Sequence, residues 1–126
     1  MNSSNRLKKN SDFIKVYRRG RSLSDRNLVL IYRKTGFENS RIGFSVSKKF
    51  GNAVERNRIK RQLKSICREL LSEIKSGYDM VFVVRVESRQ ADFRQLHDSI
   101  YGLLKRAKLC RKKQEVKDEK NPNNVD

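Results

Sequence analysis

The residues whose types and spacing could do chemistry are concentrated in one stretch, Lys48 to Arg68, which reads KKFGNAVERNRIKRQLKSICR. It holds eight Lys or Arg residues against a single acid, Glu55. A solvated protein surface usually mixes charges of both signs, because opposite charges three or four residues apart stabilise a helix. A helix that offers cations almost alone is better explained by a polyanionic partner.

The same stretch predicts an amphipathic helix. Its apolar residues recur at spacings of four, three and four, which places them on one helix face. A second set recurs in the same way about 200° around the helix axis. The apolar face consists of Ile59, Leu63, Ile66 and Leu70, and the cationic face of Asn57, Arg61, Lys64 and Arg68.

The start of this helix has a recognisable signal. Gly51 and Asn52 break the extended chain, Asn52 is a good N-cap residue, and Glu55 completes a capping-box pattern. The first turns of a helix present free N–H groups and a positive dipole end. The run Arg56-Asn57-Arg58 falls in these turns, where it can contact one phosphate backbone.

The remaining reactive residue types do not form a catalytic or metal site. Cys67 and Cys110 lack the spacing that zinc requires, and Cys67 adjoins the apolar stripe as a small core residue. His97, the only histidine, has no nucleophile near it in the sequence, so a structural or surface role is expected. No metalloprotease motif, carboxylate pair or triad is recognisable.

Composition limits the function independently. The chain has 126 residues, a net charge of +17 and a pI of about 10.4. This length suits one domain with a modest core. No apolar run approaches the length of about 18 residues that a membrane span requires, and no secretion signal is visible. Binding to a membrane surface is disfavoured, because a core would claim the apolar face of the basic helix. A cytoplasmic nucleic-acid-binding protein is predicted.

The elements around the basic helix follow from periodicity and turn residues. Residues 1–9 are expected to be mobile, and a short helix at 12–19, capped by Asn10 or Ser11, ends at Gly20. The basic helix continues to about Lys75, before Ser76 and Gly77. Strands are predicted at 21–24, 27–34, 40–48 and 79–86, the last of them central, and Asp92 opens a final helix whose inward face is Phe93, Leu96, Ile100, Leu103 and Ala107.

The strand at 40–48 alternates between two faces. Ile42, Phe44 and Val46 should be core, whereas Arg41, Gly43, Ser45 and Ser47 leave a shallow surface where an extended ligand could lie. Whether Val29 and Ile31 or Leu30 and Tyr32 share that surface stays open, because a slip of one residue exchanges the faces.

This order of elements predicts an α+β two-layer sandwich, with one sheet and helices packed mainly against one face. A single RNA-binding domain is expected over residues 1–110. Residues 111–126 are polar and contain the only proline, Pro122, which predicts a disordered tail.

Two segments resemble the bacterial ribonuclease P protein component. SVSKKFGNAVERNRIKRQLKSICRE is similar to the family's signature, in which an Arg-Asn-Arg run follows Gly-Asn-Ala-Val, and RLKKNSDFIKVYRRGRS is similar to its opening segment. The resemblance covers roughly residues 5 to 110. It implies a mixed sheet of about four strands with three helices, like a ribosomal-protein domain, and a left-handed βαβ crossover through the basic helix. General rules would favour the opposite hand.

The resemblance also implies a function. This chain would be an accessory subunit of an endoribonuclease that removes the 5′ leader of precursor tRNA, with catalysis in the RNA subunit and Mg²⁺ held through that RNA. No cofactor, membrane or protein partner is expected of the chain itself. The catalytic RNA would bind Lys48, Lys49, Asn52, Arg56, Asn57, Arg58, Lys60, Arg61, Lys64 and Arg68.

The 5′ leader would lie in a cleft on the sheet. Phe13 and Tyr17 lie four residues apart on one helix face, and plain core packing of both rings stays open as an alternative. Aromatic rings stack on any base, so such a pair can also hold a single strand without reading its sequence. Val16 lies beside that pair and is expected in the core. The family places an aromatic residue where this chain has Ile31, with Tyr32 beside it. The residues expected at the leader are Phe13, Tyr17, Val29, Ile31, Tyr32, Ser45 and Ser47.

Other classes of function remain as alternatives. A ribosomal or other structural RNA-binding protein has the same composition, and only the Arg-Asn-Arg stretch and the aromatic pair argue against it. A free-standing nuclease would need an acid–base or metal cluster that is not recognisable. An architectural DNA-binding protein would show no preference for RNA with a single-stranded leader.

Overall fold

A four-stranded sheet with the order β1–β2–β4–β3 is the centre of the fold in the computed structural model, which describes residues 3–111. The strands are β1 (Arg21–Ser24), β2 (Leu28–Lys34), β3 (Arg41–Ser45) and β4 (Tyr78–Val84). The α-helices are α1 (Asn10–Arg19), α2 (Ala53–Leu70) and α3 (Phe93–Arg106). Short 3-10 helices are η1 (Ser3–Asn5), η2 (Lys48–Phe50), η3 (Leu71–Glu73) and η4 (Val86–Gln90).

The sheet is mixed, as predicted. β2 runs antiparallel to both β1 and β4, whereas β3 and β4 are parallel neighbours. Parallel neighbours need a crossover connection, and here α2 provides it. The nearly continuous apolar run of β4 lies between β2 and β3, which confirms its central position. The predicted α+β class is therefore confirmed.

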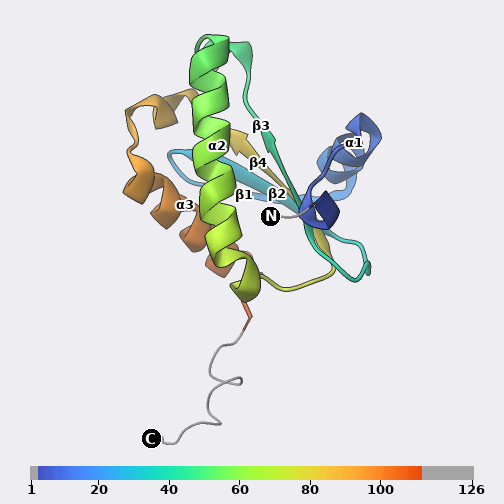
Figure 1. The fold of residues 1–126 in the computed structure, drawn as a ribbon. Coiled ribbons are helices and arrows are strands. Elements are labelled where there is room, and N and C mark those ends of the chain that lie inside the picture. Colours follow the sequence, from blue (N-terminus) through green and yellow to red (C-terminus); the bar gives the residue numbers. More distant parts are fainter. Residues whose placement is uncertain (1–2, 112–126) are drawn as a thin grey trace, which may run out of the picture.

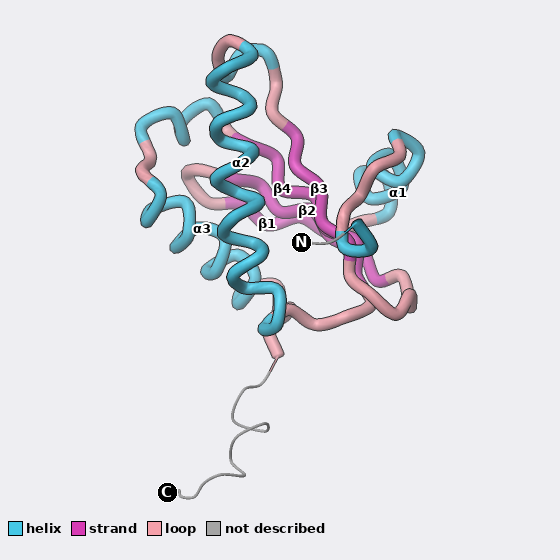
Figure 2. Tube along the Cα trace, in the orientation of Figure 1, coloured by secondary structure: helices cyan, strands magenta, loops and turns pink. Residues whose placement is uncertain are grey.

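Helices lie on both faces of the sheet. α2 and α3 cover one face, and α1 packs against the other, on β2 and β4 (Figure 1, Figure 2). The expectation of helices packed mainly against one face is confirmed, with α1 as the exception. Within residues 3–111, α1 is the only α-helix on its face of the sheet.

The main core lies between the sheet and the α2/α3 layer. The apolar stripe of α2 is buried as its periodicity predicted, and Cys67 beside it is buried too. Phe82 of β4 is fully buried and stacks on Phe44 at 6.1 Å between ring centroids. Phe44 and Val46 are only half-buried, and Phe93, predicted to face inward, is 42% exposed because it lies at the first turn of α3.

The pairing register decides which β2 side chains face α1. Ile31 lies opposite Val81, which in turn lies opposite Gly43, and Val29 continues the same face. Val16 of α1 is fully buried against Val81, as expected of a core residue. Leu30 and Tyr32 therefore point to the opposite face, where Leu30 is part of the main core and Tyr32 packs against it.

A partly buried ion-pair network attaches α1 to the sheet. Arg41 of β3 donates to both carboxylate oxygens of Asp79, at 2.9 and 2.7 Å, and lies 3.4 Å from the Asp12 carboxylate of α1. Asp79 is fully buried, and Arg33 lies 4.0 Å from it. The hydrogen bonds to Asp79 raise the pKa of Arg41, against the lowering effect of its burial. We call this network the Arg41 clamp.

Several predicted boundaries were wrong. β3 ends at Ser45, because the chain turns into η2 at Lys48, and β4 ends at Val84. α2 ends at Leu70 and continues only as η3. α1 begins at Asn10 without a side-chain cap, so neither Asn10 nor Ser11 caps it.

Residues at both ends of the described chain contact the fold. Leu7 is buried and its N–H donates to the Ile42 carbonyl at 3.1 Å, and the Asn5 side chain donates to the Ser40 carbonyl, so residues 5–7 lie along the edge of β3. Arg111, assigned to the tail, donates its N–H to the Glu73 carbonyl at 2.7 Å. The rest of the predicted disordered tail, residues 112–126, lies outside the described residues.

Candidate nucleic-acid interface

The basic helix α2 begins where its capping pattern predicted. The Asn52 Oδ1 atom accepts from the Glu55 N–H at 2.9 Å, and the Glu55 Oε1 atom accepts from the Asn52 N–H at 2.8 Å. These bonds satisfy backbone donors at the helix start. Asn52, expected to contact RNA, thus has a structural role through its side chain.

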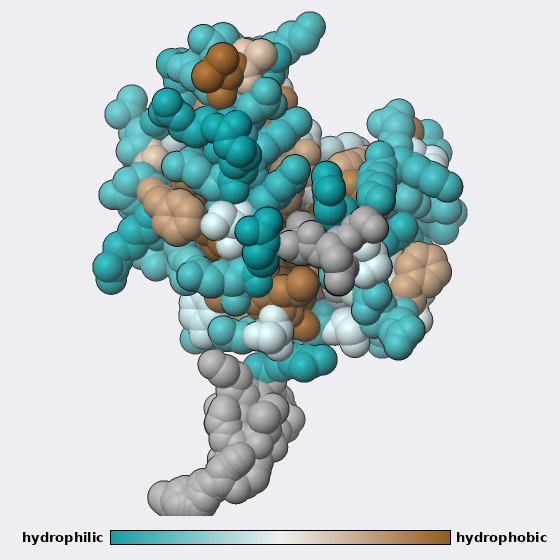
Figure 3. Space-filling view, in the orientation of Figure 1, coloured by the Kyte–Doolittle hydropathy of each residue, from teal (hydrophilic) through white to brown (hydrophobic). Residues whose placement is uncertain are grey.

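The predicted cationic face of α2 points away from the core. Asn57, Arg61 and Arg68 are exposed, and Lys64 is half-buried. Within residues 3–111, the side chains of Arg61, Lys64 and Arg68 have no ion-paired or hydrogen-bonded partner. Hydrophilic side chains cover much of the face over α2 (Figure 3). Cations that repel one another without a partner favour an anion from outside the chain.

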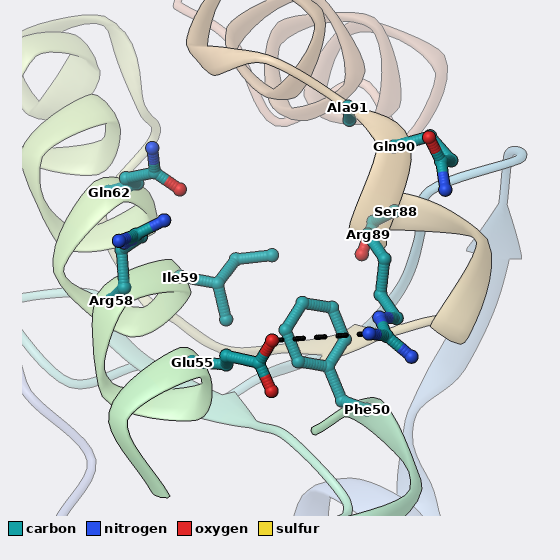
Figure 4. Close-up of a pocket in the computed structure, with 9 residues that line it drawn as sticks. All are labelled: Phe50, Glu55, Arg58, Ile59, Gln62, Ser88, Arg89, Gln90 and Ala91. Carbon is teal, nitrogen blue, oxygen red and sulfur yellow. Dashed lines mark ion pairs between the residues drawn. The ribbon is translucent and has the colours of Figure 1, made fainter. Parts of the chain in front are cut away.

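The two arginines of the Arg-Asn-Arg run differ in their surroundings. The Arg56 Nη1 atom donates to the Gly51 carbonyl at 2.6 Å, so Arg56 braces the turn that precedes α2. Arg58 is exposed and lines an open hollow of about 240 Å³ between α2 and η4. Across this hollow lies Arg89 of η4, 3.9 Å from the Glu55 carboxylate (Figure 4).

A second hollow connects α2 with α1 around the outer edge of β3. We call it the β3-edge hollow. Phe13 of α1 lines it together with Lys60 and Lys64 of α2 and Arg6 of the N-terminal segment. Lys60 and Lys64, expected to bind the catalytic RNA, are therefore next to an aromatic ring expected to bind the leader.

The face of the sheet beside α1 brings together most of the predicted leader residues. Phe13 packs with Ile31 against the small α1 core, and Val29 and Ser45 continue the same face toward the end of the sheet that α1 does not cover. Tyr17 on α1 is 45% exposed. We use the name leader cleft for these predicted leader residues of the α1 side, namely Phe13, Tyr17, Val29, Ile31 and Ser45.

Two predicted leader residues do not belong to this cleft. Tyr32 lies on the opposite face of the sheet. It follows Ile31 on β2, and successive residues of a strand point to opposite faces; its partner on β4 is Met80, which belongs to the main core. Ser47 lies beyond the end of β3, so strand alternation does not place it; it is exposed at the start of η2.

Arg6 and Arg89 were missed by the sequence reasoning. Arg6 lies in a segment expected to be mobile, and Arg89 in a connection without periodicity. Only the tertiary structure brings Arg6 beside Lys60 and Arg89 across from Arg58. Their positive charge was a signal, but 31 of the 126 residues are Lys or Arg, so charge alone does not distinguish these two arginines from the others.

Cys67 and His97 both lie at the packing of α2 in the described part of the chain. No three His, Cys, Asp or Glu side chains converge there in a way that could hold a metal ion. Burial raises the pKa of the Cys67 thiol, which keeps it protonated and unreactive. The His97 Nε2 atom lies 3.5 Å from the Glu69 carboxylate, a contact between α3 and α2. None of the described helices is long and apolar enough to cross a membrane.

Comparison with known proteins gives consistent matches. The family model for ribonuclease P matches residues 1–108. The ribonuclease P protein component of Clostridioides difficile (strain 630) is 46% identical over 104 residues, covering 82% of this chain and 91% of that protein. That of Caldanaerobacter subterraneus subsp. tengcongensis is 43% identical over 109 residues, covering 86% of this chain and 94% of that protein.

Solved structures agree in fold. The Staphylococcus aureus RNase P protein superposes with a TM-score of 0.78 at 35% identity, covering 83% of this chain and 96% of that chain. The Thermotoga maritima RNase P protein superposes with a TM-score of 0.74 at 35% identity, covering 80% of this chain and 96% of that chain.

Proposed function

Because the chain belongs to the ribonuclease P protein family, we propose that it acts in the ribonuclease P complex by binding the catalytic RNA and the 5′ leader of precursor tRNA. Membership implies a ribonuclease complex, a ribonuclease P RNA partner and a part in tRNA processing. The proposal adds which surfaces of this chain meet which RNA.

The observation that carries the proposal is the exposed cationic face of α2. Arg61, Lys64 and Arg68 lack partners within residues 3–111 and project along one line of the helix. Such a line suits the backbone of a structured RNA, which presents regularly spaced phosphates. Arg58 and Arg89 extend the cationic surface toward η4.

The leader cleft suits a different kind of RNA. Its half-exposed aromatic and aliphatic side chains offer stacking surface, whereas its polar groups are few. The β3-edge hollow adds Lys60 and Lys64 at its border, where they can neutralise phosphates of a strand that stacks on Phe13. Placed between two RNAs, these cations would offset the repulsion between their backbones.

We place catalysis in the RNA subunit, with Mg²⁺ held through RNA. The protein's contribution is then positional, by binding the substrate's leader and the catalytic RNA together. A structural RNA-binding protein outside tRNA processing is less consistent with the leader cleft, because such a role needs no sheet face beside a half-buried and an exposed aromatic ring.

The experiment is cleavage of a 5′-labelled precursor tRNA at low Mg²⁺, with this protein alone, a bacterial ribonuclease P RNA alone, and both together. We expect cleavage at the mature 5′ end only with both. A double variant, Arg61→Ala/Arg68→Ala, should bind the RNA about tenfold more weakly and lower the salt dependence of log K by about 2, one unit per lost phosphate contact. We avoid Arg56, because its substitution would also disturb the turn at Gly51.

The matched control is Arg26→Ala/Arg94→Ala, which removes the same charge from exposed positions outside α2 that line neither the hollow beside Arg58 nor the β3-edge hollow. It should change the salt dependence little. Cleavage by the protein alone would refute catalysis in RNA. Equal losses in both double variants would show that only net charge matters, and no stimulation of the RNA would favour the structural RNA-binding protein.

A further inference from the structure

A third cationic surface lies at the β1 edge of the sheet, apart from α2 and from the leader cleft. It is an open hollow of about 580 Å³ where α1 ends, next to β1, the end of β2, the start of β4 and Ala107 at the end of α3. We call it the β1-edge hollow. Four cations and two tyrosines line it: Arg19, Arg21, Arg33, Lys34, Tyr32 and Tyr78.

The charge of this hollow is not compensated from within the described chain. No carboxylate lines it. Arg33 has only the 4.0 Å contact with Asp79, which Arg41 already binds more closely. The exposed side chains of Arg19, Arg21 and Lys34 have no ion-paired or hydrogen-bonded partner among residues 3–111. Cations gathered in this way suit a polyanion.

A close approach of the end of α1 to β2 brings these cations together. An added Cβ at Gly20 would lie 2.6 Å from the Val16 carbonyl oxygen and 2.8 Å from that of Tyr32, so only glycine lets the end of α1 approach β2 this closely. Gly20 thus sets Arg19 and Arg21 directly beside the end of β2. The pairing of Lys34 with Tyr78 puts a cation and a ring next to each other on the α2/α3 face.

The position of the hollow distinguishes it from the Arg-Asn-Arg region. β4 starts at Tyr78, after α2 has ended, so the hollow lies at the end of the sheet where α2 finishes. α2 has 18 residues, which makes it about 27 Å long. A single cluster of phosphates therefore cannot contact both the β1-edge hollow and the Arg-Asn-Arg run at the start of α2.

The hollow lies just beyond the end of α1 that carries Tyr17. Tyr17, exposed on α1, lies two residues before Arg19, on the other side of the helix, and Arg21 follows at the start of β1. A single strand that stacks on Tyr17 can reach these cations by passing around the end of α1. We infer that the β1-edge hollow binds the sugar–phosphate backbone of the upstream part of a long 5′ leader, which rests on the function proposed above.

The tyrosines fit a single strand. Tyr32 and Tyr78 are half-buried on the same face of the sheet, and each ring can take a base without sequence preference. Tyr32, which the sequence reasoning assigned to the leader cleft, would contact the leader here instead. We therefore expect substitutions in the β1-edge hollow to weaken binding of precursor tRNAs with long leaders and not of those with short leaders.

The test uses the reconstituted complex of full-length protein and a bacterial ribonuclease P RNA. Affinity is measured for precursor tRNAs with leaders of about 4 and about 16 nucleotides, the range of common single-strand sites. We expect Arg21→Gln/Lys34→Gln to weaken binding of the long leader roughly three- to tenfold, and to lower its salt slope by about 1.4, at about 0.7 for each lost contact. The precursor tRNA with the short leader should bind the variant complex and the unaltered complex with the same affinity.

Arg26→Gln/Arg94→Gln is the control for lost charge and should affect neither leader. An equal loss for both leaders would overturn the inference, since the hollow would then bind the tRNA body or the catalytic RNA. No loss for either would overturn it as well. If the unaltered complex failed to distinguish the short leader from a leaderless tRNA, the proposed function itself would fail, which is a separate result.

Discussion

Phe13 and Gly43 show how one small residue shapes the leader cleft. The Phe13 ring lies on Gly43 of β3, and a Cβ added there would come within 2.5 Å of the ring. The φ angle of Gly43 is not positive, so its backbone conformation is open to other residues. Glycine is needed here because a side chain would collide with the Phe13 ring. The ring therefore owes its place over the sheet to the missing side chain.

At this residue scale we predict that Gly43→Ala displaces the Phe13 ring. Overpacking should lower the free energy of unfolding by about 1–3 kcal/mol, and the displaced ring should weaken discrimination between leader-bearing and leaderless precursor tRNA. Urea unfolding and binding assays measure the two effects. Gly102→Ala in α3 is the control, because a Cβ there meets nothing within 4 Å. Unchanged discrimination would argue against a role for Phe13.

At the scale of elements, the position of α1 depends on the Arg41 clamp. α1 contributes a small buried surface, centred on Val16, and its first turn is held through Asp12. The clamp joins α1, β3 and β4 at a buried carboxylate. Phe13 and Tyr17 of the leader cleft and Arg19 of the β1-edge hollow all belong to α1, so both surfaces depend on this attachment.

We therefore predict a large effect of Arg41→Ala. It leaves Asp79 buried without its bidentate partner, which should cost about 3–5 kcal/mol of unfolding free energy, less whatever Arg33 recovers. Arg41→Met/Asp79→Leu removes both charges and should restore much of that stability. Denaturant unfolding tests this, and affinity for the leader should remain reduced in the double variant, because Asp12 still lacks its partner. Equal stability of the two variants would contradict a buried charge as the cause.

The whole molecule carries a net charge of +17, and self-repulsion opposes its compact state. Within residues 3–111, the ion pairs join Asp12, Asp79 and Glu87 outside α2, and Glu55 and Glu69 near the two ends of α2, but none of them involves Arg61, Lys64 or Arg68. The chain thus concentrates uncompensated charge on the surfaces proposed to bind RNA. Folding and RNA binding should then respond to salt in opposite directions.

We predict that raising NaCl from about 0.05 M to about 0.5 M increases the urea midpoint of the free protein, because the Debye length falls from more than 10 Å to a few ångströms. Over the same range the affinity for the catalytic RNA should fall steeply, because fewer counterions are released on binding. Urea titration and RNA-binding isotherms measure the two. A free protein that salt destabilises would show that its ion pairs outweigh the self-repulsion.

Local patterns determined much of this protein. The capping box at Asn52 and the stripe from Ile59 to Leu70 predicted the start and buried face of α2, and the apolar run of β4 predicted a central strand. These features depend on neighbours within a few residues, which the sequence contains directly. The left-handed sense expected of the crossover came only from the resemblance, since general rules favour the other hand.

Only the tertiary structure determined which side chains share a face of the sheet and which distant segments lie together. A strand's two faces are one residue apart, so only the pairing of Ile31 with Val81 excluded Tyr32 from the leader cleft. Likewise α1 could have covered either face of the sheet, and the Arg41 clamp joins residues 29 and 38 positions apart. Contacts between distant segments have no local signal, which is why the β1-edge hollow, assembled from α1, β1, β2 and β4, was visible only in the folded chain.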